Sequence, residues 1–153
     1  MAWTPLNDHT IRGAVQLVLE SQDGAYAHPV FGPIAQWDVS NVTDMSNMFE
    51  QARSFNGDLS KWDVSKVEDM RYMFARATRF DDDLSTWNVS NVTRTTGMFQ
   101  GAKAYHRSKI LRWVRSFSRT RAIVLFWLEA TAMSVEQHRI KRARLGVVDD
   151  PLV

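Results

Sequence analysis

Short oxygen-bearing side chains recur along this 153-residue sequence at a fixed interval of 25 residues. Asp38, Asp63 and Asn88 form one such series, and a serine stands two positions after each of them. Side chains of this type commonly accept hydrogen bonds from the backbone of a following turn, and we expect that role here. Calcium binding is the alternative, because Ca²⁺ prefers clustered oxygen ligands. The further aspartates that this alternative would use are Asp58, Asp81, Asp82 and Asp83.

Those aspartates lack the fixed ligand spacing of a calcium-binding loop, and the chain contains no cysteine. We therefore predict no metal site and no cofactor. The histidines have no carboxylate or hydroxyl partner at a motif spacing, and no glycine-rich phosphate loop is present. We predict that the protein is not an enzyme. The histidines are His9, His28, His106 and His138.

A series of differing polar residues stands immediately before the tryptophans at positions 37, 62 and 87. Gln36, Lys61 and Thr86 form this series, whereas the positions around them hardly vary. Alternation along a short strand would place them outward, together with the series of Asp38, Asp63 and Asn88. Polar faces of this kind bind proteins or glycans in many repeat proteins, so we predict a protein or glycan partner across both series.

Both series belong to a repeat of 25 residues. Trp37, Trp62 and Trp87 lie 25 residues apart, and the words around them recur, for example Trp-Asp-Val-Ser-Asn-Val-Thr at 37–43. A unit of 25 residues cannot bury enough apolar surface alone, so we expect the copies to stack on one another. The apolar residues that keep the same register are expected to form the core; they include Met48, Met73, Met98, Phe49, Phe74 and Phe99.

Each copy changes its hydrophobic period. In the second copy, residues 59–64 alternate as a short strand with one buried face, whereas the apolar residues within 67–77 fall at helical spacings of three and four. We therefore predict an α/β repeat solenoid, a short right-handed stack of about three strand–helix coils. An N-terminal helix would cap it and a C-terminal helical segment would close it.

The repeat unit resembles a known family. Residues 55–65, Phe-Asn-Gly-Asp-Leu-Ser-Lys-Trp-Asp-Val-Ser, match the start of the unit of BspA-type leucine-rich-repeat surface proteins, which also occurs in repeat-bearing lipoproteins of mycoplasmas. The resemblance covers about residues 30–105. It implies a leucine-rich-repeat-like fold, a cell-surface location and a role in adhesion.

Three regions follow from these patterns. Residues 1–29 are expected to contain the capping helix, over 10–21, with one apolar face towards the first coil. Residues 30–105 hold the three repeats, and residues 106–153 form a basic helical segment. The apolar residues on the helix face are Ile11, Ala14, Val15 and Val18.

The net charge of +2 conceals a division along the chain. Residues 1–102 hold 8 Lys/Arg and 13 Asp/Glu, a balance of −5, whereas residues 103–153 hold 11 and 4, a balance of +7. No apolar run approaches the ~20 residues that a membrane-spanning helix needs. The N-terminal residues show neither the basic start nor the apolar stretch of a secretory signal, so the sequence leaves the location open.

The basic segment after Tyr105 departs from the repeat register and has three interpretations. It covers the open end of the last coil, or it binds an anionic membrane surface, or it binds nucleic acid. A frameshift or splice product would leave the same abrupt change of register. We expect a monomer. The basic residues that nucleic-acid binding would use are His138, Arg139, Lys141, Arg142 and Arg144.

Overall fold

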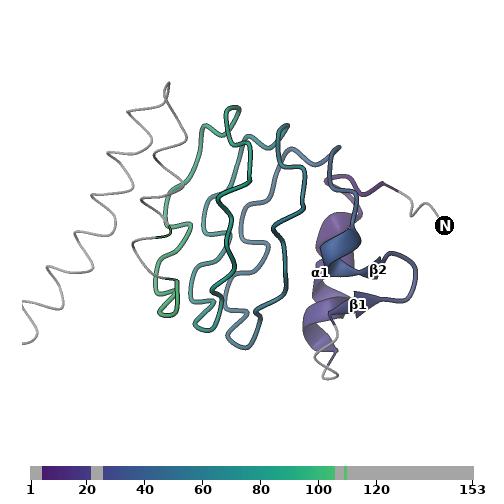
Figure 1. The fold of residues 1–153 in the computed structure, drawn as a ribbon, viewed down its shortest axis with the longest axis horizontal. Coiled ribbons are helices and arrows are strands. Elements are labelled where there is room, and N and C mark those ends of the chain that lie inside the picture. Colours follow the sequence, from purple (N-terminus) through teal and green to yellow (C-terminus); the bar gives the residue numbers. More distant parts are fainter. Residues whose placement is uncertain (1–4, 22–25, 106–108, 110–153) are drawn as a thin grey trace, which may run out of the picture.

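The computed structural model describes residues 5–21, 26–105 and 109. In order along the chain, the regular elements are the helix α1 (Ile11–Glu20), the short strands β1 (Ala27–His28) and β2 (Gly32–Pro33), and the 3₁₀ helix Ile34–Gln36. The following residues, as far as 105, form a series of loops that lie side by side (Figure 1). The helix and the β1–β2 hairpin lie at one end of that series (Figure 1).

The helix α1 falls within the range 10–21 in which the apolar spacing predicts a helix. Before it, the side-chain Oδ1 of Asn7 accepts hydrogen bonds from the backbone N–H groups of His9 (3.0 Å) and Thr10 (3.2 Å) and so turns the chain into the helix. The apolar face is directed into the core, and its residues are all buried; they are Ile11, Ala14, Val15 and Val18.

The β1–β2 hairpin leads the chain from α1 into the repeats. The strands pair antiparallel, with His28 opposite Gly32. The imidazole Nδ1 of His28 accepts hydrogen bonds from the backbone N–H groups of Val30 (3.0 Å) and Phe31 (3.2 Å), which closes the connecting turn. The carbonyl of Gly32 accepts a bond of 2.9 Å from the indole of Trp37, so the hairpin is tied to the first repeat.

The three repeats, residues 34–58, 59–83 and 84–105, are joined by backbone hydrogen bonds. Alternate N–H groups of one repeat donate to carbonyl groups 24 residues later, in the next repeat, at 2.7–2.9 Å. All these donors face the C-terminal neighbour, so the N-terminal edge of the stack presents carbonyl groups. The donors are the N–H groups of Met45, Asn47, Phe49, Gln51, Met70, Tyr72, Phe74 and Arg76.

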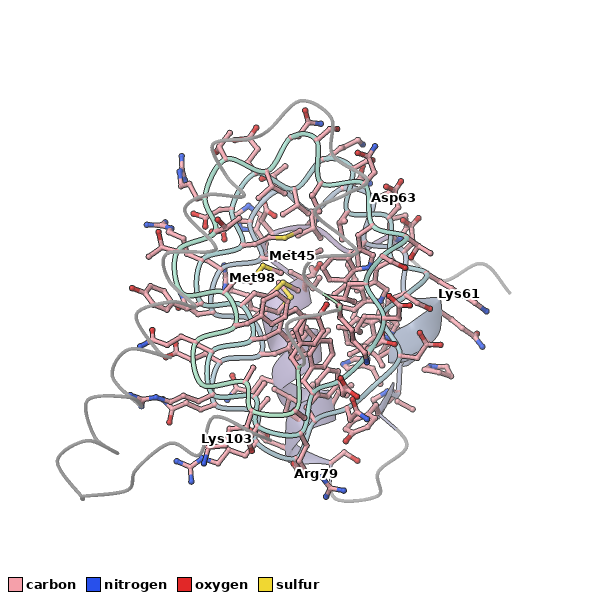
Figure 2. All side chains as sticks on the ribbon, turned by 60° about the vertical axis from the view of Figure 1, so that its left-hand side comes forward. Met45, Lys61, Asp63, Arg79, Met98 and Lys103 are labelled. Carbon is pink, nitrogen blue, oxygen red and sulfur yellow. The ribbon has the colours of Figure 1, made fainter. Side chains whose placement is uncertain are left out.

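The core is a set of side-chain columns that run through the repeats. The rings of Phe49 and Phe74 stack with centroids 5.4 Å apart, and Phe74 and Phe99 stack at the same distance. Phe55, Phe80 and Tyr105 form a second column, at 6.0 and 5.7 Å. Met45 and Met98 mark the centre of this core in Figure 2. The residues that the sequence assigns to the core are therefore packed against their own counterparts in adjacent repeats.

The predicted α/β solenoid of strand–helix coils is wrong for the part of the chain that the structure describes. Its α-helix is α1 and its strands are β1 and β2. Apart from the 3₁₀ helix Ile34–Gln36, the repeats contain turns and isolated parallel bridges, such as the one between Asp44 and Asp69. Among the described residues, the leucine-rich-repeat-like architecture implied by the family resemblance is not seen either. The spacing of the apolar residues predicted correctly which side chains are buried, but it predicted a helical backbone where the structure has turns.

Left-handed backbone conformations explain why no α-helix forms in the repeats, residues 34–105. Asn47 (φ 57°) and Gln51 (φ 60°) interrupt the segment in which the spacing of apolar residues indicates a helix. The donated bonds described above also use N–H groups that a helix would need for itself. The same two positions have positive φ in the other repeats; they hold Tyr72, Arg76, Gly97 and Gly101.

Gly97 shows how closely neighbouring repeats approach. A Cβ atom at this position would lie 2.3 Å from a ring carbon of Tyr72, besides having to adopt a φ of +65°. The ring of Tyr72, a residue that is 38% exposed, therefore lies over the backbone of the next repeat.

Candidate interaction surface

The three residues predicted to contact a partner are all exposed. Gln36, Lys61 and Thr86, the variable column, occupy equivalent positions in successive repeats. The hydroxyl of Thr86 donates a hydrogen bond of 2.7 Å to the carbonyl of Ser60, which links the third repeat to the second. Figure 2 shows Lys61 and Asp63 on the same side of the molecule.

The Asp/Asn series is exposed too, but its oxygens are used in turns. Asp38 accepts bonds from the N–H (3.1 Å) and the hydroxyl (2.7 Å) of Ser40, and Asp63 accepts one from the Ser65 N–H (3.0 Å). Asn88 accepts the corresponding bond from Ser90 at 3.2 Å. The hydrogen bonds from Ser65 lower the pKa of Asp63. The expected turn role is confirmed, and these side chains fix the backbone beside the variable column.

Buried tryptophans lie directly beneath that column. The indole N–H of Trp62 donates to the carbonyl of Ile34 (2.8 Å), and that of Trp87 donates to the carbonyl of Leu59 (2.9 Å). Each bond reaches the preceding repeat, so each tryptophan both fills the core and joins two repeats. The exposed residue that precedes it is consequently attached to a backbone with little freedom to move.

The aspartates considered for calcium are engaged elsewhere. Asp58 accepts bonds from Ser60, and the Asp82 carboxylate accepts a bond of 2.7 Å from the N–H of Leu59. Burial raises the pKa of Asp82, although this hydrogen bond opposes the shift. Among the described residues, no three His, Asp or Glu side chains are placed to hold a metal ion.

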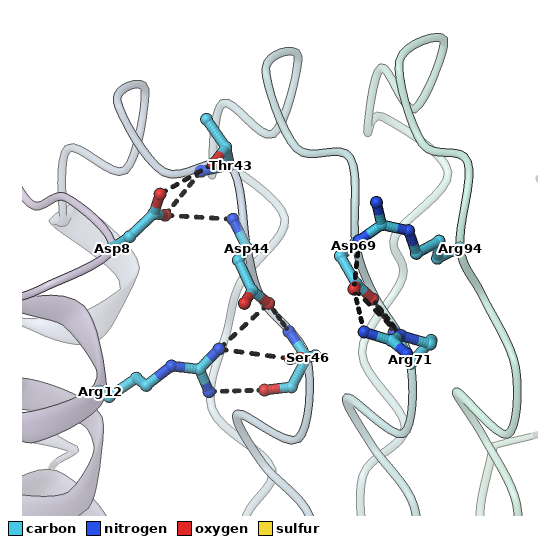
Figure 3. A network of polar contacts seen from close by, with 8 residues as sticks. All are labelled: Asp8, Arg12, Thr43, Asp44, Ser46, Asp69, Arg71 and Arg94. Atoms are coloured by element: carbon cyan, nitrogen blue, oxygen red, sulfur yellow. Dashed lines mark hydrogen bonds and ion pairs between the residues drawn. The ribbon is translucent and has the colours of Figure 1, made fainter.

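A row of charges that the sequence pattern did not reveal crosses the stack (Figure 3). Asp69 is central to it, because its side chain is 4% exposed and pairs with Arg71 (2.7 Å) and Arg94 (3.1 Å). Burial alone would raise the pKa of Asp69, but hydrogen bonds from the two arginines outweigh it and lower the pKa. At the start of the row, Arg12 of α1 pairs with Asp44 at 3.0 Å.

The repeat register explains this arrangement. Asp44 and Asp69 occupy one position of the unit, and in the third repeat that position holds Arg94. Replacement of an acid by a base within the column turns a repulsion between adjacent carboxylates into an ion pair. In the sequence, the signal for this ion pair is the single arginine at a position that holds aspartate in the other two repeats.

Asp8 completes the N-terminal end of the stack (Figure 3). In the second repeat, the N–H groups of Glu68 and Asp69 donate to the carbonyl of Thr43 in the repeat before it. The first repeat has no preceding repeat, and the Oδ1 of Asp8 accepts the equivalent bonds from Thr43 (2.8 Å) and Asp44 (3.1 Å). A carboxylate thus replaces the missing carbonyl.

Arg12 plays the matching role at the carbonyl edge. Its Nη1 donates a hydrogen bond of 2.6 Å to the carbonyl of Ser46, and its Nη2 donates to the Ser46 hydroxyl at 3.3 Å. The segment that carries α1 therefore caps both kinds of backbone group at the N-terminal edge of the first repeat, the N–H groups with an anion and a carbonyl with a cation.

A second charged region lies at another side of the molecule and was not anticipated. Its four exposed cationic residues come from all three repeats, and we call them the basic corner; they are Arg53, Arg76, Arg79 and Lys103. Figure 2 shows Arg79 and Lys103 at one end of the view, away from Lys61 and Asp63. In the sequence, the signal for the basic corner is that its four cations fall at closely spaced positions of the repeat unit.

Several predicted features lie outside the described residues. They include the basic helical segment expected over residues 106–153, except for residue 109, and two of the histidines. His28, which is described, serves in the hairpin turn. Among the described residues, no helix is long and apolar enough to cross a membrane. The basic residues predicted for nucleic-acid binding also lie outside; they are His138, Arg139, Lys141, Arg142 and Arg144.

Comparison with known proteins gives one match. The model of a family described as "Mycoplasma protein of unknown function, DUF285" matches residues 23–134. No curated protein and no solved structure matches the chain.

Proposed function

The chain belongs to the family described as Mycoplasma protein of unknown function, DUF285, and on that premise we propose that it is a non-catalytic module that recognises a protein or a glycan. The contact surface is the variable column of Gln36, Lys61 and Thr86. The observation that carries the proposal is a contrast: the column varies in side-chain type and is exposed, whereas the tryptophan that follows each member is constant and buried.

Rigidity beneath the column supports binding. The Asx turns on one side and the tryptophan indoles below hold the backbone before a partner arrives. Less conformational entropy is then lost when the exposed side chains are immobilised. Adjacent hydrogen-bonded backbones are about 4.8 Å apart, so the three members extend over roughly 10 Å, enough for a short peptide or a few sugar rings.

The test is a binding screen of the intact chain on a glycan array and a protein array. A Gln36→Ala/Lys61→Ala/Thr86→Ala variant should lose about tenfold in affinity for any hit, since three polar contacts each contribute on the order of 0.5 kcal/mol. The matched control is Gln100→Ala/Lys66→Ala/Thr93→Ala, which removes the same residue types from other exposed positions. Equal affinities of the two variants would reject the proposal.

The resemblance to BspA-type surface proteins agrees with a recognition role and supports a cell-surface location as part of the proposal. Antibody labelling of intact cells that express the protein tests this location. Labelling that appears only after the cells are permeabilised would reject it.

The competing function is nucleic-acid or anionic-membrane binding through the C-terminal segment, which the balance of +7 on residues 103–153 favours. It would replace the first proposal if glutamine at four basic positions removed all binding while the triple alanine variant retained it. The four positions are Arg139, Lys141, Arg142 and Arg144.

A further inference from the structure

We propose that the basic corner binds a linear anionic glycan, a polysaccharide with sulfate or carboxylate groups along its length. This site uses none of the residues of the variable column. It therefore goes beyond the proposed function, and either one can fail without the other.

Contacts between the repeats hold the corner together. The hydroxyl of Thr78 donates to the carbonyl of Arg53 at 3.1 Å, and the N–H of Ala104 donates to the carbonyl of Thr78 at 3.2 Å. These bonds align three successive loops. Arg53, Thr78 and Lys103 occupy the same position of the repeat unit in those loops, and Arg79 occupies the position that follows it. Loops at the spacing of hydrogen-bonded backbones, about 4.8 Å, present their cations as a short ladder.

Arg76 is held towards the same loops. Its N–H donates to the carbonyl of Gln100 at 2.7 Å, and its Cγ lies 3.4 Å from the position that a Cβ on Gly101 would take. The Arg76 stem thus lies within van der Waals distance of the third repeat at Gly101. Two repeats therefore contribute to the position of this one guanidinium group.

The charge of the corner is uncompensated. None of its four cations makes an ion pair within the part of the chain that the structure describes. By contrast, Arg12, Arg71, Arg94 and Lys109 all pair with aspartates. Four like charges without ion-pair partners create a positive potential that attracts a polyanion, and binding releases the cations condensed along the polyanion.

The chemistry of the corner favours a glycan over the other polyanions. Binding of single-stranded nucleic acid relies on exposed aromatic rings for base stacking, and membrane binding relies on inserted apolar side chains. The exposed large apolar residues among those described are Leu17, Val30 and Tyr72. The first two lie on α1 and in the hairpin turn, and the Tyr72 ring lies against Gly97, so none forms a stacking row with the four cations.

Heparin is the probe, because it is a linear sulfated polysaccharide, and its affinity for the full chain is measured over a series of salt concentrations. Substitutions come from the equivalent positions of other repeats, which keeps each loop compatible with the fold. The test variant combines four substitutions. Arg53→Thr and Lys103→Thr follow Thr78, Arg76→Gln follows Gln51, and Arg79→Ser follows Ser54. The basic residues after 109 are the same in all variants, so their contribution cancels in the comparison.

The test variant should bind heparin about tenfold more weakly and with a shallower dependence on salt, because four cation contacts are lost. Single variants Arg79→Ser and Lys66→Asn form a matched pair, each removing one exposed charge; only the first should weaken binding measurably. They also serve if the combined variant fails to fold. Unchanged heparin affinity in the combined variant, or in Arg79→Ser if the combined variant does not fold, would overturn the proposal.

Oligothymidine and vesicles containing an anionic lipid are measured with the same variants. Their affinities should change less than that of heparin. An equal or larger loss for either probe would overturn the assignment of a glycan and point to nucleic acid or membrane instead.

Discussion

The indole Nε1 of Trp62 donates a hydrogen bond of 2.8 Å to the backbone carbonyl of Ile34 in the preceding repeat. Trp87 makes the equivalent bond to Leu59, and Trp37 makes one to Gly32 of the hairpin. Tryptophan is the aromatic residue that combines a large apolar surface with an N–H donor, which accounts for its presence at this position in all three repeats.

Trp62→Phe should lower the free energy of unfolding by about 1–3 kcal/mol, because it removes the indole hydrogen bond and leaves a smaller ring in the core. The Ile34 carbonyl keeps the bond of 3.3 Å that it accepts from the N–H of Trp37. Urea denaturation at neutral pH measures the change. Phe80→Leu is the comparison, since it reduces a buried ring without removing a hydrogen bond. A cost for Trp62→Phe no greater than that of Phe80→Leu would mean that the indole bond contributes nothing.

Asp8→Ala should destabilise the protein by about 1–2 kcal/mol, as the loss of a helix cap does, because two backbone N–H groups lose their acceptor. Asp8→Asn keeps a carbonyl oxygen where Oδ1 accepts both bonds and should cost less than half as much. Thermal unfolding of the two variants checks the order. If alanine and asparagine were equally harmful, the charge and not the acceptor would be responsible.

Asp69→Asn should lower the melting temperature by a few degrees at neutral pH. The pKa of Asp69 is below its ordinary value of 3.8, so its carboxylate contributes stability that is present above that pH and is lost as the pH falls through the lowered pKa. The difference between wild type and variant should therefore shrink in acid. Melting curves between neutral and acidic pH measure it.

Asp63→Asn is the control for that series, because Asn88 occupies the equivalent position and makes the same turn. It removes an exposed carboxylate that forms no ion pair among the described residues, so its effect should be smaller at neutral pH. Identical melting curves for the two variants would contradict a special role for Asp69.

Tyr105→Phe should make the protein more resistant to alkali. Burial raises the pKa of Tyr105 above its ordinary value of 10.0, and the carboxylates of Asp83, Asp82 and Asp81 raise it further. The neutral phenol therefore contributes stability that is present below pH 10 and is lost as the pH rises above it.

Urea denaturation across the alkaline range tests the prediction, and phenylalanine suits the site because Phe55 and Phe80 occupy it in the other repeats. Near neutral pH the variant should be about as stable as wild type. The prediction fails if the stability of both falls equally above pH 10.

The sequence by itself determined the period of 25 residues, the membership of the core, the apolar face of α1 and the use of Asp38, Asp63 and Asn88 in turns. These features depend on residue type at fixed spacing, and burial follows that spacing whichever backbone conformation produces it. For the same reason the spacing could not distinguish a short helix from successive turns, and the predicted strand–helix coils were wrong.

The tertiary structure alone decided which backbone groups bond to which. The N–H of Met45 donates to the carbonyl of Asp69, and such a long-range bond leaves no local pattern in the sequence. The same applies to Asp8 as a substitute for a missing carbonyl, to the pairing of Arg94 with Asp69, and to the meeting of four cations at the basic corner. Each depends on stacking that brings residues about 25 or more positions apart into contact, and only the stacked repeats create those neighbours.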